Sequence, residues 1–375
     1  MLALALPLML LLIQTAIGQS IRIHGQASGA LGTSYDTSFL GRAGLRYIPD
    51  ATLRYGAFDA EASVNGFAGA DVRVDSSDFE ALLKPHRLWA RFTTARFDVR
   101  AGLQKINFGS ALLLRPLQWF DRIDPRDPLG LTDGVYAALG RYYFQNNSNL
   151  WAWGLLGNSV TKGWEVYQSP HWSPEFGGRV QVPVARGEAA VSYHHRRVKI
   201  EQFATPEVPR ESLYEDMQDE DRLGLDAKFD IGLGLWFEGS VSRQTWTRLS
   251  GENAPSWQRA ATVGADYTFD LGNGLLVTAE HLTLDVGADP FRLDQTNHVS
   301  AALASYPLGL VDNLRGIVFF DWSSHKPYTY LSWQRTLDNW VVNLAAFWNP
   351  DNPVGLAGGS GAAGKGVQLT VMFNH

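Results

Sequence analysis

Cationic side chains are concentrated in one part of this 375-residue chain, and they are the first residues whose type and spacing suggest chemistry. Residues 84–126 contain nine Lys and Arg residues, and four Asp residues lie in this stretch or directly after it. The surplus of five positive charges contrasts with the net charge of -6 for the whole chain. Such a cluster attracts anions if its members face one water-filled space.

Sequence alternation predicts which of these side chains share a face. In residues 86–94 and 96–106 every second residue is apolar, so the polar residues between them lie on the opposite face of a strand. If these strands belong to a barrel that crosses a membrane, an Arg that faces lipid at mid-membrane costs about 2–4 kcal/mol. The polar face would then line the enclosed lumen of the barrel. They either line a pore or pair with lumen carboxylates and only stabilise the wall. The predicted lumen-facing residues are Arg87, Arg91, Arg96, Asp98, Arg100 and Gln104.

The segment 107–133 is too long for a turn and too apolar for a loop in water. Its leucines, with Trp119 and Phe120, would form an exposed patch of the kind that promotes aggregation. We therefore expect it to fold into the lumen as a third long loop that narrows the pore. Its stretch 120–128 is rich in charge and contains two prolines, so a rigid surface turn held by salt bridges is the alternative. The candidate pore residues here are Arg115, Asp121, Arg122, Asp124, Arg126 and Asp127.

The other charged or titratable clusters are weaker candidates for a functional site. His194 and His195 are neighbours, so a strand would place them on opposite faces, unable to share a metal, and we expect residues 194–199 to form a cationic rim. Residues 201–221 hold eight acids and one Arg, which is typical of a solvated loop; calcium bridging is the alternative. His281 and His298 show no partner pattern in the sequence. We expect no enzyme, no metal and no cofactor.

Composition excludes several classes of protein. There is no Cys, which excludes disulfides, thiolate metal sites and cysteine nucleophiles. Only 19% of residues are charged and 12% are aromatic, which excludes intrinsic disorder. A negative net charge argues against nucleic acid as a partner.

The elements that must position these residues are strands, because the dominant period of the sequence is two. We predict an all-β fold, a transmembrane antiparallel up-and-down barrel of about 18 strands, with 16 as the alternative. Short links, such as Arg186-Gly187, alternate with longer loops, such as 33–40 and 71–85, and this is the plan of an outer-membrane barrel. The predicted strands are 20–32, 41–48, 57–70, 86–94, 96–106, 134–144, 149–158, 175–184, 188–199, 220–231, 234–248, 258–270, 275–286, 296–306, 313–323, 327–336, 340–349 and 366–375.

A soluble sandwich also alternates, but it rarely has this many strands. Strands of this length suit a bilayer, which a tilted strand crosses in about 9–11 residues. Because strand edges cannot remain unpaired in lipid, the last strand should pair with the first. An even number of strands then places both chain ends at the rim that carries the short turns, which we assign to the periplasm.

The pattern of the first 18 residues indicates an export signal. Residues 2–13 are apolar apart from Pro7, and Ala16-Ile17-Gly18 matches the small residues that precede a cleavage site. We predict a signal peptide over residues 1–18 and a barrel over residues 19–375. The predicted location is the cell outer membrane of a Gram-negative bacterium.

Two features resemble known outer-membrane proteins. The alternating segment 366–375 resembles the terminal strand that barrel-insertion machinery recognises, although Asn374 and His375 follow its last aromatic residue, Phe373. The layout as a whole is similar to the porins, and 18 strands are similar to the alginate-export and substrate-specific porin families. The run 101–109 followed by Phe120-Asp121 resembles a Gly-x-Gln…Gly…Phe-Asp pattern in alginate-export proteins.

The resemblance implies a channel for passive diffusion of small hydrophilic solutes, anions among them. The alternative is a structural or secretion-linked barrel, including an export conduit, that works with periplasmic partners. The resemblance also implies outer-membrane lipid and the barrel-insertion machinery as partners, with an oligomer as an option.

Overall fold

The computed structural model describes residues 20–36, 38–165, 167–200, 216–244, 257–350 and 364–375. The predicted signal peptide 1–18 lies outside the described residues, as does most of the acidic segment 201–221.

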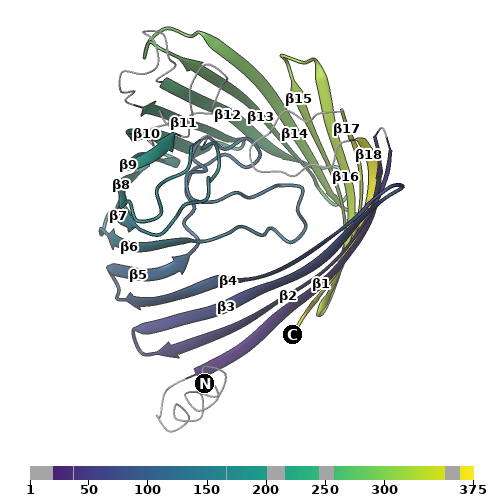
Figure 1. Cartoon of the computed structure of the whole chain (residues 1–375). Coiled ribbons are helices and arrows are strands. Elements are labelled where there is room, and N and C mark those ends of the chain that lie inside the picture. Colours follow the sequence, from purple (N-terminus) through teal and green to yellow (C-terminus); the bar gives the residue numbers. More distant parts are fainter. Residues whose placement is uncertain (1–19, 37, 166, 201–215, 245–256, 351–363) are drawn as a thin grey trace, which may run out of the picture.

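Eighteen strands form one closed antiparallel sheet in the described part of the chain, and β1 pairs with both β2 and β18 (Figure 1). The predicted barrel and its closure are confirmed. The two described chain ends lie at the same rim as the short turns. The strands are β1 (Ser20–Tyr35), β2 (Phe39–Tyr55), β3 (Phe58–Arg73), β4 (Ser77–Thr93), β5 (Phe97–Gln104), β6 (Val135–Tyr143), β7 (Asn149–Leu155), β8 (Glu175–Val184), β9 (Gly187–Ile200), β10 (Asp216–Asp230), β11 (Gly234–Gln244), β12 (Trp257–Phe269), β13 (Leu275–Gly287), β14 (Gln295–Pro307), β15 (Asp312–Asp321), β16 (Lys326–Leu337), β17 (Trp340–Asn349) and β18 (Gly364–Asn374).

The two faces of the sheet differ as the period of two predicts. Apolar side chains cover the outside, where Leu45 and Leu83 are 70% and 77% exposed. The inner face carries polar and charged groups, such as the buried pair Arg179 and Asp226. An outside of this kind suits an apolar solvent and an inside of this kind suits water. Among the described residues, no helix has the length and apolar character to cross a membrane.

Two predicted strand limits, the end at residue 48 and the start at residue 86, are wrong because proline occurs inside the strand. Strand β2 continues through Pro49 to Tyr55, and its pairing with β3 is interrupted around residues 48–49. Strand β4 begins at Ser77 and passes Pro85, next to a bulge at which His86 is the extra residue. Proline has no backbone N–H to donate to a neighbouring strand, so in a sequence it indicates the end of a strand. An interruption in the pairing or a bulge nevertheless accommodates it. The predicted loops 33–40 and 71–85 shrink to residues 36–38 and 74–76.

The seam of the barrel includes the last residue. Gly25 and His375 exchange backbone hydrogen bonds of 3.0 Å in both directions. The His375 ring stacks on Phe373 and on Tyr47, and its Nε2 lies 3.1 Å from the Tyr47 hydroxyl. His375 therefore continues the outer face of β18 with an aromatic ring, two residues beyond the aromatic residue identified in the sequence.

Candidate functional site in the barrel lumen

The loop between β5 and β6, residues 105–134, folds into the barrel, as predicted (Figure 1). Two inward-facing carboxylates hold it against the wall. Glu280 on β13 accepts the backbone N–H groups of Leu112, Leu113 and Leu114 at 2.7, 3.0 and 2.6 Å. Glu238 on β11 accepts those of Ala111 and Leu117 at 2.9 and 2.6 Å. Charge-assisted bonds of this kind are among the stronger ones in proteins.

Glu238 also explains a glycine in the loop. Gly109 has a φ of +99°, and a Cβ at this position would overlap the Glu238 carboxylate. Both the backbone conformation and the close approach require glycine here.

Apolar packing completes the docking of the third loop. Its buried side chains form a cluster with inward-facing residues of β6 and β7, and Phe108 lies at its centre against Trp119, Phe120 and Trp153. A second cluster joins Leu113 and Leu114 to β12–β16. This packing removes the predicted aggregation-prone patch from water.

The loop between β7 and β8, residues 156–174, also folds inward, which the sequence did not indicate. The Trp164 indole N–H donates to the Arg115 carbonyl at 2.8 Å, and the Arg122 guanidinium contacts the Gly163 carbonyl at 3.5 Å. The two loops therefore support each other inside the barrel.

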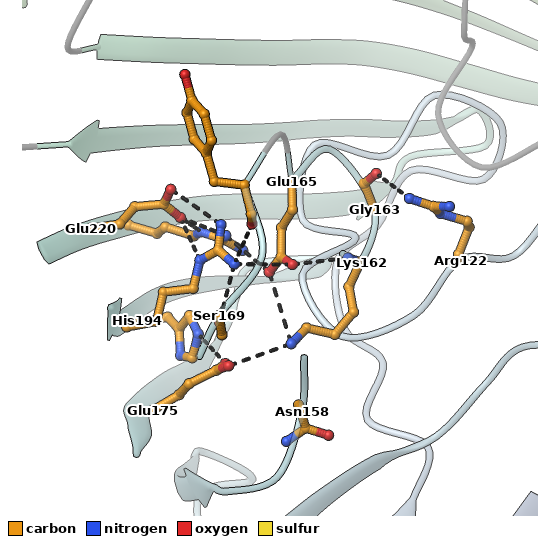
Figure 2. Close-up of polar contacts among 12 residues, drawn as sticks. Arg122, Asn158, Lys162, Gly163, Glu165, Ser169, Glu175, His194 and Glu220 are labelled. Carbon is orange, nitrogen blue, oxygen red and sulfur yellow. Dashed lines mark hydrogen bonds and ion pairs between the residues drawn. The ribbon is translucent and has the colours of Figure 1, made fainter. Parts of the chain in front are cut away.

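A network of buried ions holds this second loop (Figure 2). Glu165 from the loop binds Arg196 on β9 at 3.1 Å and Arg222 on β10 at 3.0 Å, and both arginines also bind Glu220. Lys162 lies 3.6 Å from Glu175, whose other oxygen lies 3.3 Å from His194. Three acids face three permanent cations, so the network is balanced and serves as an anchor.

This network corrects the prediction of a cationic rim at 194–199. His194 and Arg196 are fully buried inside the barrel, while His195 and Arg197 face outward beside Asp221 and Asp219. The two histidines do lie on opposite faces, as expected.

The predicted lumen residues of β4 and β5 face inward near the short-turn rim. Arg91 binds Asp59 through two bonds of 2.9 and 2.6 Å and lies 3.6 Å from Asp98. Arg100 stacks on Trp89, with its guanidinium carbon 4.5 Å from the ring centre, and makes no ion pair within 4.0 Å in the described part of the chain. Pairing with a lumen carboxylate, one of the two outcomes left open by the sequence, therefore occurs at Arg91, while Arg100 lies on the same wall without such a pair among the described residues.

The remaining predicted residues fall into three groups. Arg87 donates to the Thr132 carbonyl and thereby contacts the third loop, while Arg96 lies exposed in the turn before β5. Buried positions are occupied by Gln104, which donates to the Ala137 carbonyl, and by the ion pair Arg115–Asp121. These buried groups hold the loop in place. The third group is Arg122, Asp124, Arg126 and Asp127, which lie in the middle of the third loop.

The tip of the third loop faces the opposite wall across a cavity of about 240 Å³. Arg126 binds Asp124 through two bonds of 2.9 Å, and Asp127 accepts the backbone N–H groups of Leu129 and Leu131. The stretch 120–128 is thus both a rigid turn and an inward one. The opposite wall consists of residues on β15–β18 and Arg42 on β2.

A larger cavity of about 770 Å³ adjoins it, because Arg42 and Gln368 line both. Its wall is the inner face of β1–β4, where glycines leave room and four acids and two arginines line the space. The pair Arg42–Asp71 is typical, with a bond of 2.9 Å. Sequence reasoning missed this wall, although residues 39–47 show the same alternation as β4.

One serine–histidine contact lies on the outer face. His281 Nδ1 is 2.9 Å from Ser300 Oγ, which also accepts a bond from the Trp322 indole at 2.8 Å. The His281 ring stacks on His298. A hydrolytic site needs a third group that orients the histidine. No carboxylate hydrogen-bonds to His281 within the described residues.

Comparisons place this architecture among known barrels. No protein-family model matches the chain, and no curated protein matches it in sequence. Among solved structures, it resembles OccAB1 of Acinetobacter baumannii with a TM-score of 0.57 and 10% identity, over 96% of this chain and 97% of that one. For OccAB4 of the same organism the TM-score is 0.55 and the sequence identity is 6%, over 96% of this chain and 99% of that one. For OmpT of Vibrio cholerae, in a trimer form, the TM-score is 0.50 and the sequence identity is 10%, over 96% of this chain and 100% of that one.

At these identities the likeness concerns the fold. The chain has the fold of an 18-stranded β-barrel, similar to the folds of OccAB1, OccAB4 and the outer-membrane protein OmpT.

Proposed function

We propose that the chain is an outer-membrane channel through which small hydrophilic solutes diffuse passively. The observation that carries the proposal is the space left beside the two inward loops. These loops fill the barrel next to β5–β13, while adjoining cavities of about 240 and 770 Å³ remain along β15–β18 and β1–β4. Polar and charged side chains line this space, so water and hydrated solutes are its natural contents.

The channel should prefer anions modestly. Arg91 is neutralised by Asp59, but Arg100 on the same inner wall has no such partner among the described residues. Arg91 and Arg100 also lie directly opposite each other on adjacent strands, and like charges in this arrangement repel. An unpaired cation in a narrow, low-dielectric passage attracts anions. The two cavities themselves are lined by three arginines and six acids, so exclusion of cations is not expected.

A structural or secretion-linked barrel with periplasmic partners is the second candidate. The observation that favours it is the second inward loop, since two loops that support each other reduce the passage. Under either function we place the protein in the outer membrane, with the short-turn rim in the periplasm. An oligomer stays a prediction; OmpT, one of the similar barrels, is described as a trimer. We infer no enzymatic activity, because no carboxylate in the described part of the chain orients the His281–Ser300 contact.

Liposome swelling separates the two candidates. Purified protein is incorporated into liposomes, which are diluted into isotonic solutions of sugars and organic anions of graded size. A diffusion channel admits small solutes at rates that fall with size, and small anions enter faster than neutral solutes of equal size. Protein-containing liposomes that admit solutes no faster than protein-free liposomes would favour the structural barrel.

A further inference from the structure

A third cavity lies deeper in the barrel, where the wall meets both inward loops. Its volume is about 430 Å³, within the range of small-molecule sites. It is bounded by the middle of β2–β4, by residues 120–122 in the middle of the third loop, by the end of that loop and by the beginning of the second inward loop, with Leu103 of β5 and the first residues of β6. Seven separate segments of the chain therefore line one space.

The acids that line this cavity already have partners. Asp133 binds Lys84 at 2.6 Å, and Asp121 binds Arg115 at 3.0 Å from within the third loop. Their negative charges are offset locally, so they do not neutralise further cations around the cavity.

Two guanidinium groups at the same cavity lack a carboxylate. Arg46 on β2 donates to the Asn65 side-chain oxygen at 3.2 Å and stacks on Phe67 with 4.8 Å to the ring centre. Arg122 makes one long contact to the Gly163 carbonyl. Neither forms an ion pair within 4.0 Å with any residue that the structure describes. A guanidinium has five N–H donors, so most donors of both groups remain free.

The surroundings hold these two cations in place. The backbone N–H of Arg122 donates to the Thr132 hydroxyl at 3.0 Å, which ties the middle of the third loop to its C-terminal end. Phe67 supports the face of the Arg46 guanidinium. Ser159 and Thr161 line the cavity from the second inward loop and offer hydroxyl groups next to the charges.

We propose that this cavity is a binding subsite for an oxyanion, the carboxylate or phosphate group of a small polar solute, with Arg46 and Arg122 as its charged ligands. The subsite rests on the proposed channel function and deepens it, since it names the class of solute that pauses in the lumen. Guanidinium groups match the oxygens of carboxylate and phosphate in both charge and geometry. The neighbouring hydroxyls suit a hydroxylated solute such as a sugar acid.

Calorimetric titration of the purified barrel in detergent tests the site without reference to transport. Gluconate supplies a carboxylate, inorganic phosphate supplies the other oxyanion, and sorbitol is the neutral analogue of gluconate. The variants are Arg46→Gln, Arg122→Gln and the double change. The control is Arg335→Gln, which breaks an exposed pair with Asp312 far from the cavity. Heat-modifiable migration in gels confirms that each barrel is folded.

We expect saturable binding of gluconate, phosphate or both to the wild type, and none of sorbitol. Each charge-assisted hydrogen bond contributes about 1.5–3 kcal/mol, so the double change should weaken binding at least ten-fold while the control binds as the wild type does. Tighter binding of gluconate than of phosphate would identify a carboxylate as the ligand, and the reverse order a phosphate.

Absence of oxyanion binding to the wild type, or equal binding to the double variant, would overturn the subsite. A parallel bilayer recording keeps the two proposals apart. Binding without any conductance would leave the subsite in place and refute the channel. Conductance without binding would refute the subsite alone.

Discussion

Replacement of Glu280 by Gln should release the third loop from the wall while leaving the barrel folded. The change conserves volume and affects one inward-facing side chain of β13. Glu280 Oε2 accepts two backbone N–H groups, from Leu113 and Leu114, and Oε1 accepts those of Leu112 and of the Trp236 indole. A Gln side chain keeps one carbonyl acceptor and places an NH₂ donor against the N–H groups on the other side.

The size of the effect follows from these contacts. A hydrogen bond to a charged group contributes about 1.5–3 kcal/mol. Loss of the two bonds to one oxygen weakens docking of the loop by at least about 3 kcal/mol. Because about 1.4 kcal/mol corresponds to a factor of ten, the loop should open at least about 100-fold more often.

Amide hydrogen exchange followed by mass spectrometry measures this opening in peptides that cover residues 108–120. Exchange of these peptides should accelerate by about two orders of magnitude, while peptides from β1–β4 keep their protection. Glu188→Gln is the matched control, because Glu188 accepts a bond from Gln181 near the short-turn rim and does not contact the loop. Unchanged exchange in the third loop of Glu280→Gln would show that the carboxylate does not anchor it.

Four other changes test separate parts of the account. Arg179→Ala leaves Asp226 buried without its partner and should lower barrel stability by about 3–5 kcal/mol in urea titrations of the detergent-solubilised protein; an unchanged midpoint would argue against a buried pair. Trp164→Ala removes the bond to the Arg115 carbonyl and should speed amide exchange in residues 156–165, with no such effect if the second loop docks through its ion pairs alone. The double change Arg91→Gln and Arg100→Gln exposes Asp59 and should shift zero-current potentials in a KCl gradient toward cations; a stability loss without that shift would make both arginines structural. An epitope inserted in the described loop 288–294 should be labelled on intact cells and one at Arg186-Gly187 should not; the opposite pattern would reverse the assigned orientation.

The barrel could be predicted because its signal is local. Each strand alternates within its own ten or so residues, and the loop 107–133 carries its apolar side chains in one stretch. The errors at Pro49 and Pro85 arose because a proline ends most strands. Pairing with β1 keeps Pro49 in the sheet, and a bulge in the pairing with β3 accommodates Pro85.

The docking of the loops depends on contacts that are distant in sequence. Glu238 and Glu280 look like ordinary inward residues, and only the fold places them under the third loop. The second inward loop has few apolar residues, so nothing in its own sequence predicted burial. Its anchors are Arg196 and Arg222, on strands that follow it. The subsite around Arg46 and Arg122 likewise joins segments that only the inward folding of the two loops brings together.

Single-channel recording of the purified, folded protein in planar bilayers shows whether the barrel conducts ions. We expect stepwise increases of conductance in KCl, with a zero-current potential that indicates a modest preference for chloride. Bilayers that remain silent after insertion of folded protein would contradict the channel, and steps with a clear preference for potassium would contradict the anion-attracting lumen.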